Sequence, residues 1–395
     1  MNGSHPLAIL FTVILIDLIG FGIVIPILPF LSPKLGASHL DIALIISCYA
    51  ICAGICGPTW GRLSDRYGRK PIIMVCLSGG ALSYVMLGLA SELWMVYAAR
   101  AFAGLMAGNF GVASAMMADV TPPDSRTRGM GMIGVAWGLG LVLGPLIGGF
   151  LSGDSGSFLL PCIVAGAISF LAVIAAALIL PESLSVERQA ANRRYQRSGG
   201  GGSVMHMLKE TGNRLLTAQF VVHNACVSSV TYIFPLWAGD MLGWGAKDVG
   251  LIFGIQGAII VVMQGGLIGP AAAAVGEIFL LRGAVLMFIA GAAIGVFADN
   301  MSWLLATVFV AMTGATLCMP LLTSIASQRT PIGLRGRMLG TTNAASSWGR
   351  VVGPLVAGAN LAVFGYSGAW MGVVLILLFY LTWTFSQQGV VRAKS

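Results

Sequence analysis

The sequence predicts an all-α polytopic membrane protein, with twelve transmembrane helices in two pseudo-symmetric six-helix bundles around a central cavity. Hydrophobic residues make up 57% of the 395-residue chain and the mean hydropathy is +0.89, far above the values of soluble domains. These residues gather in continuous stretches of about 20, the length with which a helix crosses the hydrocarbon core. The stretches do not alternate with polar residues, which excludes a transmembrane β-barrel.

Twelve apolar stretches mark the expected spans in chain order. They cover residues 7–30, 39–60, 71–91, 93–118, 129–152, 157–181, 214–238, 246–270, 277–298, 302–326, 336–363 and 367–386. One long polar break divides them into six and six, and its Gly-Gly-Gly-Gly-Ser run has the composition of a flexible linker. We therefore expect an N-terminal bundle over residues 1–181, a cytoplasmic linker over 182–213 and a C-terminal bundle over 214–395.

The two halves of the chain also repeat one another. A shift of 209 residues places Arg126 on Arg335, and the Gly-Pro-Leu run that begins at Gly144 on the one that begins at Gly353. Two parallel six-helix repeats around a central cavity are typical of transporters that work by rocking one bundle against the other.

The net charge of +8 is an orientation signal. Most of the 22 Lys and Arg residues fall in loops and tails on one side of the expected spans. By the positive-inside rule, this asymmetry predicts a multi-pass protein of the cell (inner) membrane with both termini cytoplasmic. We expect contacts with membrane lipids and none with nucleic acid.

Asp17 is the only acidic residue near the middle of an expected span. Charges inside a membrane are costly and indicate function by default. Burial disfavours the ionised carboxylate, so Asp17 is the best candidate for a proton carrier, with Arg100 of the fourth span as its partner. The alternative is a structural Asp17–Arg100 pair that never titrates.

Residues 61–70 place five charges between the second and third spans of a chain that is 9% charged overall. An anion at Asp65 can cap a helix N-terminus, and the cations can bridge to acidic helix ends or to lipid phosphates. Contacts of this kind, broken as the bundles rock, would form a conformational latch. The residues that we assign to the latch are Gly61, Arg62, Asp65, Arg66, Gly68, Arg69, Lys70 and Asp119.

The alternative for this segment is a purely topogenic basic loop. That role explains the cations but explains neither Asp65 nor the glycines. In the second half, the aligned residues 269–278 keep both glycines, but the positions of Arg62, Asp65, Arg66 and Lys70 hold the uncharged Pro270, Ala273, Ala274 and Ile278. A single, one-sided latch accounts for this difference better than topogenesis does.

The fifth span carries a glycine groove and one proline. Its residues are Gly138, Gly140, Gly144, Pro145, Gly148 and Gly149. Small residues at this spacing permit close helix contact, and a proline leaves a carbonyl without its helical partner. The groove predicts a tight seam between the halves, with generic packing as the alternative.

The C-terminal half supplies further polar residues inside spans. His223 is a second candidate for proton coupling because only histidine titrates near neutrality without perturbation. Arg350, near the middle of the eleventh span, could bind an anionic substrate group, pair with Asp17, or snorkel. The residues that we assign to the substrate cavity are Arg350, Asn224, Gln256, Gln264, Asn109 and Asn343, and hydrogen-bonded packing is the alternative for the uncharged ones.

Several of these motifs resemble those of a known family. The signature at residues 61–70, Arg100 with Gly104 and Gly108, and the glycine motif at residues 138–149 resemble those of the major facilitator superfamily. Asp17 with Gly20, Gly22, Pro26 and Pro29 resembles the first-span motif of its twelve-span drug/proton antiporters, which include the tetracycline exporters. This resemblance implies a monomer that exports a small-molecule substrate in exchange for protons, with a role in drug efflux and antibiotic resistance.

Two stretches depart from the tetracycline exporters. Those proteins have acidic residues within spans 3 and 9, whereas the aligned stretches here, residues 81–84 and 289–292, contain none. This difference argues against coordination of a metal–drug complex. One Asp and one mid-membrane Arg favour neutral, zwitterionic or anionic amphipathic substrates.

Enzyme chemistry is not expected. The chain has no metal-ligand spacing, nucleotide-binding loop or nucleophile elbow, so we expect no cofactor, no metal and an ion gradient as the energy source. The seven cysteines all fall in expected spans and imply no disulfide framework. The alternatives are a proton-coupled uptake symporter for a small organic anion, and a non-transporting receptor or lipid scramblase.

Overall fold

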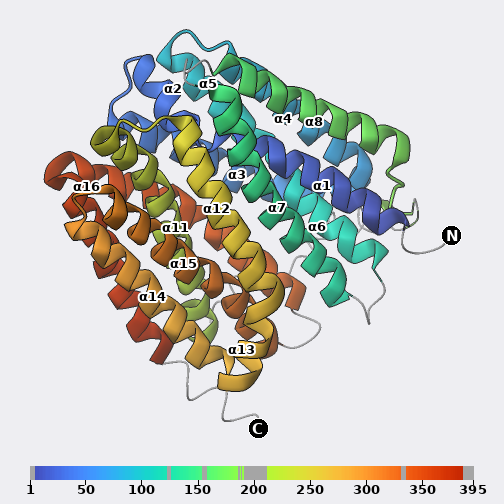
Figure 1. Ribbon diagram of the computed structural model, residues 1–395. Coiled ribbons are helices and arrows are strands. Elements are labelled where there is room, and N and C mark those ends of the chain that lie inside the picture. Colours follow the sequence, from blue (N-terminus) through green and yellow to red (C-terminus); the bar gives the residue numbers. More distant parts are fainter. Residues whose placement is uncertain are drawn as a thin grey trace. The chain divides into compact units, whose positions relative to one another are not determined.

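The computed structural model consists of helices throughout the part of the chain that it describes (Figure 1). It describes residues 5–121, 126–153, 158–185, 187, 189–190, 211–330 and 335–385. Nine of the helices in these ranges are long and apolar enough to cross a membrane. The predicted class, an all-α polytopic membrane protein, is confirmed.

The chain divides into two compact units, and each exchanges one short segment with the other. Unit 1 contains Met1–Ala37, Ile51–Gly201 and Gly245–Gly257, and unit 2 contains Ser38–Ala50, Gly202–Trp244 and Ala258–Ser395. Residues 186, 188 and 191–210 of the predicted linker lie outside the described part, so the bounds of the linker stay a prediction. The two exchanged segments were not predicted.

Unit 1 is built mainly from the first half of the chain. Its helices are α1 (His5–Val24), α2 (Leu28–Lys34), the second part of α3 (His39–Tyr67), α4 (Arg69–Gly88), α5 (Leu93–Leu105), α6 (Asn109–Val120), α7 (Arg126–Ser152) and α8 (Leu159–Ile179). Helix α1 packs against α7 and α8, and α4 packs against α8. Buried Leu10, Leu77 and Met117 belong to the core between them.

Two of the expected spans in this unit are interrupted. The first breaks after Val24 because Pro26 has no N–H to donate, and α2 resumes with Pro29 near its start. The fourth breaks between α5 and α6, at residues 106–108. The count of twelve spans stays a prediction, since several expected spans are not single helices.

Unit 2 is built mainly from the second half. Its elements are α11 (Thr211–Leu242), the end of α12 (Ala246–Val262), the π-helical turn η2 (Met263–Leu267), α13 (Ile268–Val275), α14 (Glu277–Phe297), α15 (Met301–Arg329) and α16 (Arg335–Phe385). Helix α16 joins the last two expected spans across Gly365, whose φ of 67° is a non-helical conformation that glycine adopts without strain. Buried Trp237, Phe288 and Trp370 belong to the core of this unit.

The segment Ser38–Ala50 of α3 is fastened into unit 2 by hydrogen bonds. The Tyr232 hydroxyl donates to the His39 carbonyl at 2.6 Å, and Ser47 Oγ donates to the Val351 carbonyl at 2.9 Å. Asp240 accepts a hydrogen bond of 2.5 Å from Tyr366 and lies 3.4 Å from His39 Nε2. Helix α3 therefore belongs to unit 2 at its start and to unit 1 from Ile51 onward.

Candidate functional site

The predicted latch segment is helical for most of its length. Helix α3 continues to Tyr67 and α4 begins at Arg69, so only Gly68 separates them, whereas the expected spans 39–60 and 71–91 left all of residues 61–70 outside a span. Gly68 has a φ of 107°, which glycine adopts without the clash that a Cβ would cause. A Cβ at this position would also lie 2.4 Å from Glu182 Oε2. Both the backbone and the close neighbour require a glycine here.

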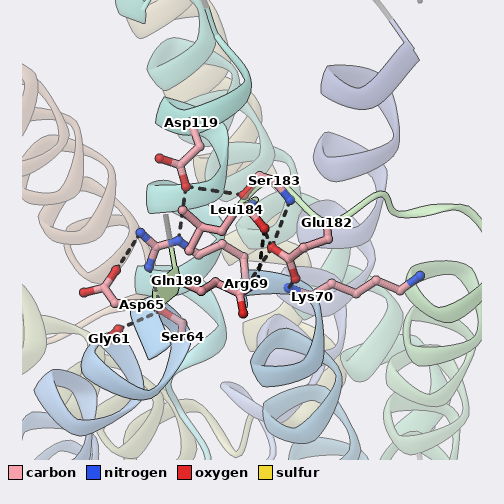
Figure 2. A network of polar contacts seen from close by, with 10 residues as sticks. All are labelled: Gly61, Ser64, Asp65, Arg69, Lys70, Asp119, Glu182, Ser183, Leu184 and Gln189. Carbon is pink, nitrogen blue, oxygen red and sulfur yellow. Dashed lines mark hydrogen bonds and ion pairs between the residues drawn. The ribbon is translucent and has the colours of Figure 1, made fainter. Parts of the chain in front are cut away.

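Arg69 is the centre of a partly buried polar network (Figure 2). Its guanidinium lies 2.8 Å from Asp65 Oδ1, 3.2 Å from Asp119 Oδ2 and 2.6 Å from Ser64 Oγ. Only 10% of the Arg69 side chain is exposed, so these charge-assisted hydrogen bonds are stronger than they would be in water. The network joins the end of α3, the start of α4 and the end of α6.

Glu182, which the sequence did not single out, completes this network. Its carboxylate accepts hydrogen bonds from the backbone N–H groups of Arg69 at 2.9 Å and Lys70 at 3.1 Å. The first N–H groups of a helix have no partner within the helix, and an anion there is favoured by the helix dipole. Glu182 also accepts from the N–H groups of Ser183 and Leu184, so it holds the segment after α8 against the start of α4.

The other predicted latch residues surround this network. Lys70 Nζ donates to the Ala177 carbonyl at 2.8 Å, and Ser183 Oγ donates to Asp119 at 3.3 Å. Arg62 and Arg66 are exposed, with the Arg66 guanidinium 5.0 Å from the Tyr67 ring. A Cβ at Gly61 would meet no atom within 4 Å. Asp65 contacts Arg69, and its role as a helix cap stays a prediction.

Asp17 is brought to Asn109 at the break in the fourth span. The Asn109 amide donates a hydrogen bond to the Asp17 carboxylate. Cys76 of α4 is close enough to Asp17 for an electrostatic interaction. Arg100, the predicted partner of Asp17, is buried on α5, where it interacts electrostatically with Cys162 of α8. The structure thus brings together two residues that were predicted for separate roles.

Trp60 of α3 explains why the break can persist inside a bundle. Its indole N–H donates to the Leu105 carbonyl at 2.6 Å, at the end of α5, so a carbonyl freed by the break has a partner. The backbone of Gly108 packs directly against the Trp60 ring, because a Cβ at this position would come within 2.3 Å of it. Helix α6 then begins at Asn109, with its N-terminal end next to Asp17.

The glycines of α7 pack on two neighbours within unit 1. A Cβ at Gly144 would lie 2.5 Å from the Cα of Gly22 on α1, and Gly140 and Gly148 make equally close contacts with the same helix. Gly149 faces the exchanged segment Gly245–Gly257, where a Cβ on Gly250 would lie 2.3 Å from the Pro145 carbonyl. Gly138 is buried. The groove therefore makes close backbone contacts with helices from both halves of the sequence.

The cavity candidates of the second half are distributed over both units. Gln256 is buried in unit 1, whereas Gln264 in unit 2 donates to the Thr316 carbonyl at 3.2 Å. Asn224 donates to the Phe220 carbonyl of its own helix at 3.0 Å. His223 is buried, with its ring centroid 6.5 Å from Phe288 and 6.4 Å from Tyr380.

Arg350 and Asn343 both lie on α16. Arg350 Nη2 donates to Ser347 Oγ at 2.9 Å. Ser347 Oγ in turn donates to the Asn343 carbonyl at 3.3 Å. Both candidates therefore belong to one short polar stretch of this helix.

An ionisable side chain at a broken helix, inside a bundle of apolar spans, is a feature of membrane transporters. The family model of the Major Facilitator Superfamily matches residues 10–354. The chain therefore belongs to this superfamily of transporters, and the resemblance seen in its motifs is confirmed.

Relatives in this family match over most of the chain. Tetracycline resistance protein, class H, of Pasteurella multocida is 28% identical over 400 residues, which cover 98% of this chain and 97% of that protein. Tetracycline resistance protein, class B, of Escherichia coli is 28% identical over 360 residues, which cover 90% and 88%.

Solved structures share the fold. The crystal structure of the human organic anion transporter MFSD10 (TETRAN) aligns with a TM-score of 0.74 at 20% identity, covering 97% of this chain and 100% of that one. A bacterial homolog of the human lysosomal transporter Spinster aligns with a TM-score of 0.80 at 14% identity, covering 98% and 97%.

Proposed function

We propose that the protein is a proton-coupled antiporter that exports a small amphipathic drug-like or metabolite substrate by alternating access. The position of Asp17 carries this proposal. Its carboxylate lies within a helix of the membrane-spanning part and accepts a hydrogen bond from Asn109 at the start of α6. A carboxyl group in this setting is a natural proton carrier, because apolar surroundings disfavour its ionised form.

Asn109 is suited to hold Asp17 in either protonation state. The asparagine amide has both donor hydrogens and an acceptor oxygen. It donates to the ionised carboxylate and, after rotation of the amide, accepts from the protonated acid. The proton can then bind and leave while α1 and α6 remain joined, which is what a repeated transport cycle requires.

The direction of transport is supported by the relatives and by the glycine motif of α7. The relatives named above are tetracycline resistance proteins, a name that fits drug efflux. The motif at residues 138–149 resembles that of antiporters. The missing acids at residues 81–84 and 289–292 favour a substrate other than a metal–drug complex.

The Arg69 network serves in this proposal as the latch of one transport conformation. In the topology that we propose, with both termini cytoplasmic, residues 61–70 and Glu182 are cytoplasmic as well. The exposed Arg62 and Arg66 would then face lipid phosphates or water. The protein works as a monomer in the inner membrane. Breaking and reforming contacts of Arg69 would favour one conformation over another.

Proton flux in proteoliposomes tests the proposed function. Purified protein is reconstituted with an internal pH-sensitive dye, and flux is measured when tetracycline or an amphipathic dye is added outside. We expect substrate-driven proton movement for the wild type and for Asp299→Asn, which changes an exposed acid next to Asn300. Asp17→Asn should abolish it. Equal proton flux in Asp17→Asn and wild type would refute the assignment, and co-directional movement of substrate and proton would identify a symporter.

A further inference from the structure

Arg350 is a charged side chain of a membrane-spanning helix without an acidic partner in the described ranges. Ion pairs of other residues in these ranges include those of His39 with Asp240 and of Arg69 with Asp65 and Asp119. The hydrogen bond of Arg350 is to the neutral hydroxyl of Ser347. A guanidinium inside a membrane normally pairs with an anion or faces a water-filled cavity, because the lipid phase does not solvate it.

The position of Arg350 around α16 separates it from lipid. At about 100° per residue, Asn343, Ser347 and Arg350 lie within about 60° of one another on the helix circumference. Trp348 and Val352, which are 54% and 44% exposed, lie on the opposite side and form an apolar face suited to lipid. The polar stripe therefore lies on the side of α16 opposite this apolar face, with Asn343 exposed and with Ser347 and Arg350 partly buried.

Two packed surfaces flank this polar stripe. On one side Gly349 and Gly353 lie against α11, where a Cβ on either would come within 2.2 Å of a backbone carbonyl. On the other side the Val351 carbonyl accepts the hydrogen bond from Ser47 of α3. Helix α16 is thus fixed in rotation by α11 and α3. The stripe with Arg350 points between these two neighbours.

Tyr49 adds a second polar group at this position. Its phenol is close enough to Arg350 for an electrostatic interaction, and it comes from the segment Ser38–Ala50 that belongs to unit 2. Arginine binds carboxylates and related oxyanions with several parallel N–H donors, and hydroxyl groups beside it complete the shell of donors.

We propose that Asn343, Ser347 and Arg350, with Tyr49, form an anchoring site for an anionic group of the transported substrate, such as a carboxylate or sulfonate. This inference rests on the proposed transport function and narrows its substrate class to amphipathic anions and zwitterions. The site lies in unit 2, whereas the proton carrier Asp17 lies in unit 1. Substrate and proton therefore bind to separate groups.

A pair of xanthene dyes of similar shape tests the charge preference. Fluorescein carries a carboxylate, and rhodamine 6G is a cation in which the corresponding group is esterified. Binding of each to the purified full-length protein in detergent is measured by fluorescence anisotropy. We expect the wild type to bind fluorescein roughly tenfold or more tightly than rhodamine 6G, as a desolvated charge pair would give.

Three variants assign the preference to Arg350. Arg350→Gln should weaken fluorescein binding by roughly tenfold or more and leave rhodamine 6G unchanged, and Arg350→Lys should lie between it and the wild type. The matched control is Arg282→Gln, since Arg282 of α14 donates to the Thr384 carbonyl and stacks on Phe385, away from the stripe. It should bind both dyes as the wild type does.

Several results would overturn the proposal. They are the absence of fluorescein binding to the wild type, equal binding of the two dyes, and unchanged fluorescein binding in Arg350→Gln. A purely structural role of Arg350 would weaken both dyes equally and would also lower the thermal unfolding temperature of Arg350→Gln. Equilibrium binding needs no proton gradient, so the two proposals can fail separately. If fluorescein binding depends on Arg350 but proton flux does not depend on Asp17, the anion site stands and the proton coupling is refuted. The converse result would refute only the anion site.

Discussion

Replacing Arg69 by methionine removes the centre of the polar network and keeps most of the volume of the side chain. The change deletes the contacts with Asp65, Asp119 and Ser64, whereas the backbone N–H of residue 69 can still donate to Glu182. The variant therefore tests the side-chain network without removing the anion at the start of α4.

The expected cost follows from the burial of the three groups. The exposed fractions of the side chains are 10% for Arg69, 22% for Asp119 and 37% for Asp65. Breaking a fully buried ion pair costs about 3–5 kcal/mol, and an exposed pair contributes at most about 1 kcal/mol. Asp119 is closer to the buried case and Asp65 to the exposed one. We expect Arg69→Met to lower the free energy of unfolding by about 2–4 kcal/mol.

A double-mutant cycle with Asp119→Asn isolates the pair. Unfolding of wild type, both single variants and the double variant is measured in mixed micelles with increasing SDS. We expect a coupling free energy of about 1–3 kcal/mol between the two positions. The matched control is Arg66→Met, whose exposed guanidinium lies over Tyr67, and its effect should stay within about 0.5 kcal/mol.

A coupling free energy near zero would show that the Arg69–Asp119 contact contributes nothing to stability. If Arg66→Met lowers the free energy of unfolding as much as Arg69→Met does, the loss of stability comes from removing any positive charge from this segment and not from breaking the network. Either result would refute the network as described. If the network is a latch, Arg69→Met should also slow substrate efflux while membrane insertion stays normal.

Three further changes test other parts of the structure. Glu182→Gln keeps the shape and removes the charge that faces the Arg69 and Lys70 N–H groups, so it should lower the free energy of unfolding by about 1 kcal/mol in the same SDS titration. Gly144→Ala places a methyl group 2.5 Å from the Gly22 Cα and should cost about 1–3 kcal/mol, whereas Gly111→Ala, with open space, should cost nothing measurable. Asn109→Ala removes the hydrogen bond to Asp17 and should slow proton-coupled efflux about tenfold, while Asn109→Gln should recover part of the rate. Wild-type stability in Glu182→Gln and Gly144→Ala, or wild-type efflux in Asn109→Ala, would contradict the assigned contacts.

The features that could be predicted from the sequence are those set by local composition. The apolar stretches predict a helical membrane protein because a lipid phase leaves the backbone few other solutions. The glycines of α7 predict close helix contact because their spacing places them along one stripe. The charges at residues 61–70 and Asp119 were predicted to interact, and Arg69 joins them in the structure.

The features that could not be predicted depend on contacts between distant residues. The break at residues 106–108 contains no proline, and it is supported by Trp60, which lies 45 residues before its partner Leu105. Glu182 is separated from Arg69 by 113 positions, so nothing near it in the sequence shows which N–H groups it meets. The helical continuation of α3 to Tyr67 was missed because a cluster of charges is typical of a loop.

Proton release on substrate binding tests the exchange of substrate for a proton at Asp17 most directly. Purified protein in a weakly buffered detergent solution is titrated with a transported substrate while a pH-sensitive dye reports released protons. We expect the wild type to release up to about one proton per bound molecule near neutral pH, and Asp17→Asn to bind the substrate without release. Proton release from Asp17→Asn equal to that of the wild type would contradict the assignment of Asp17 as the coupling site.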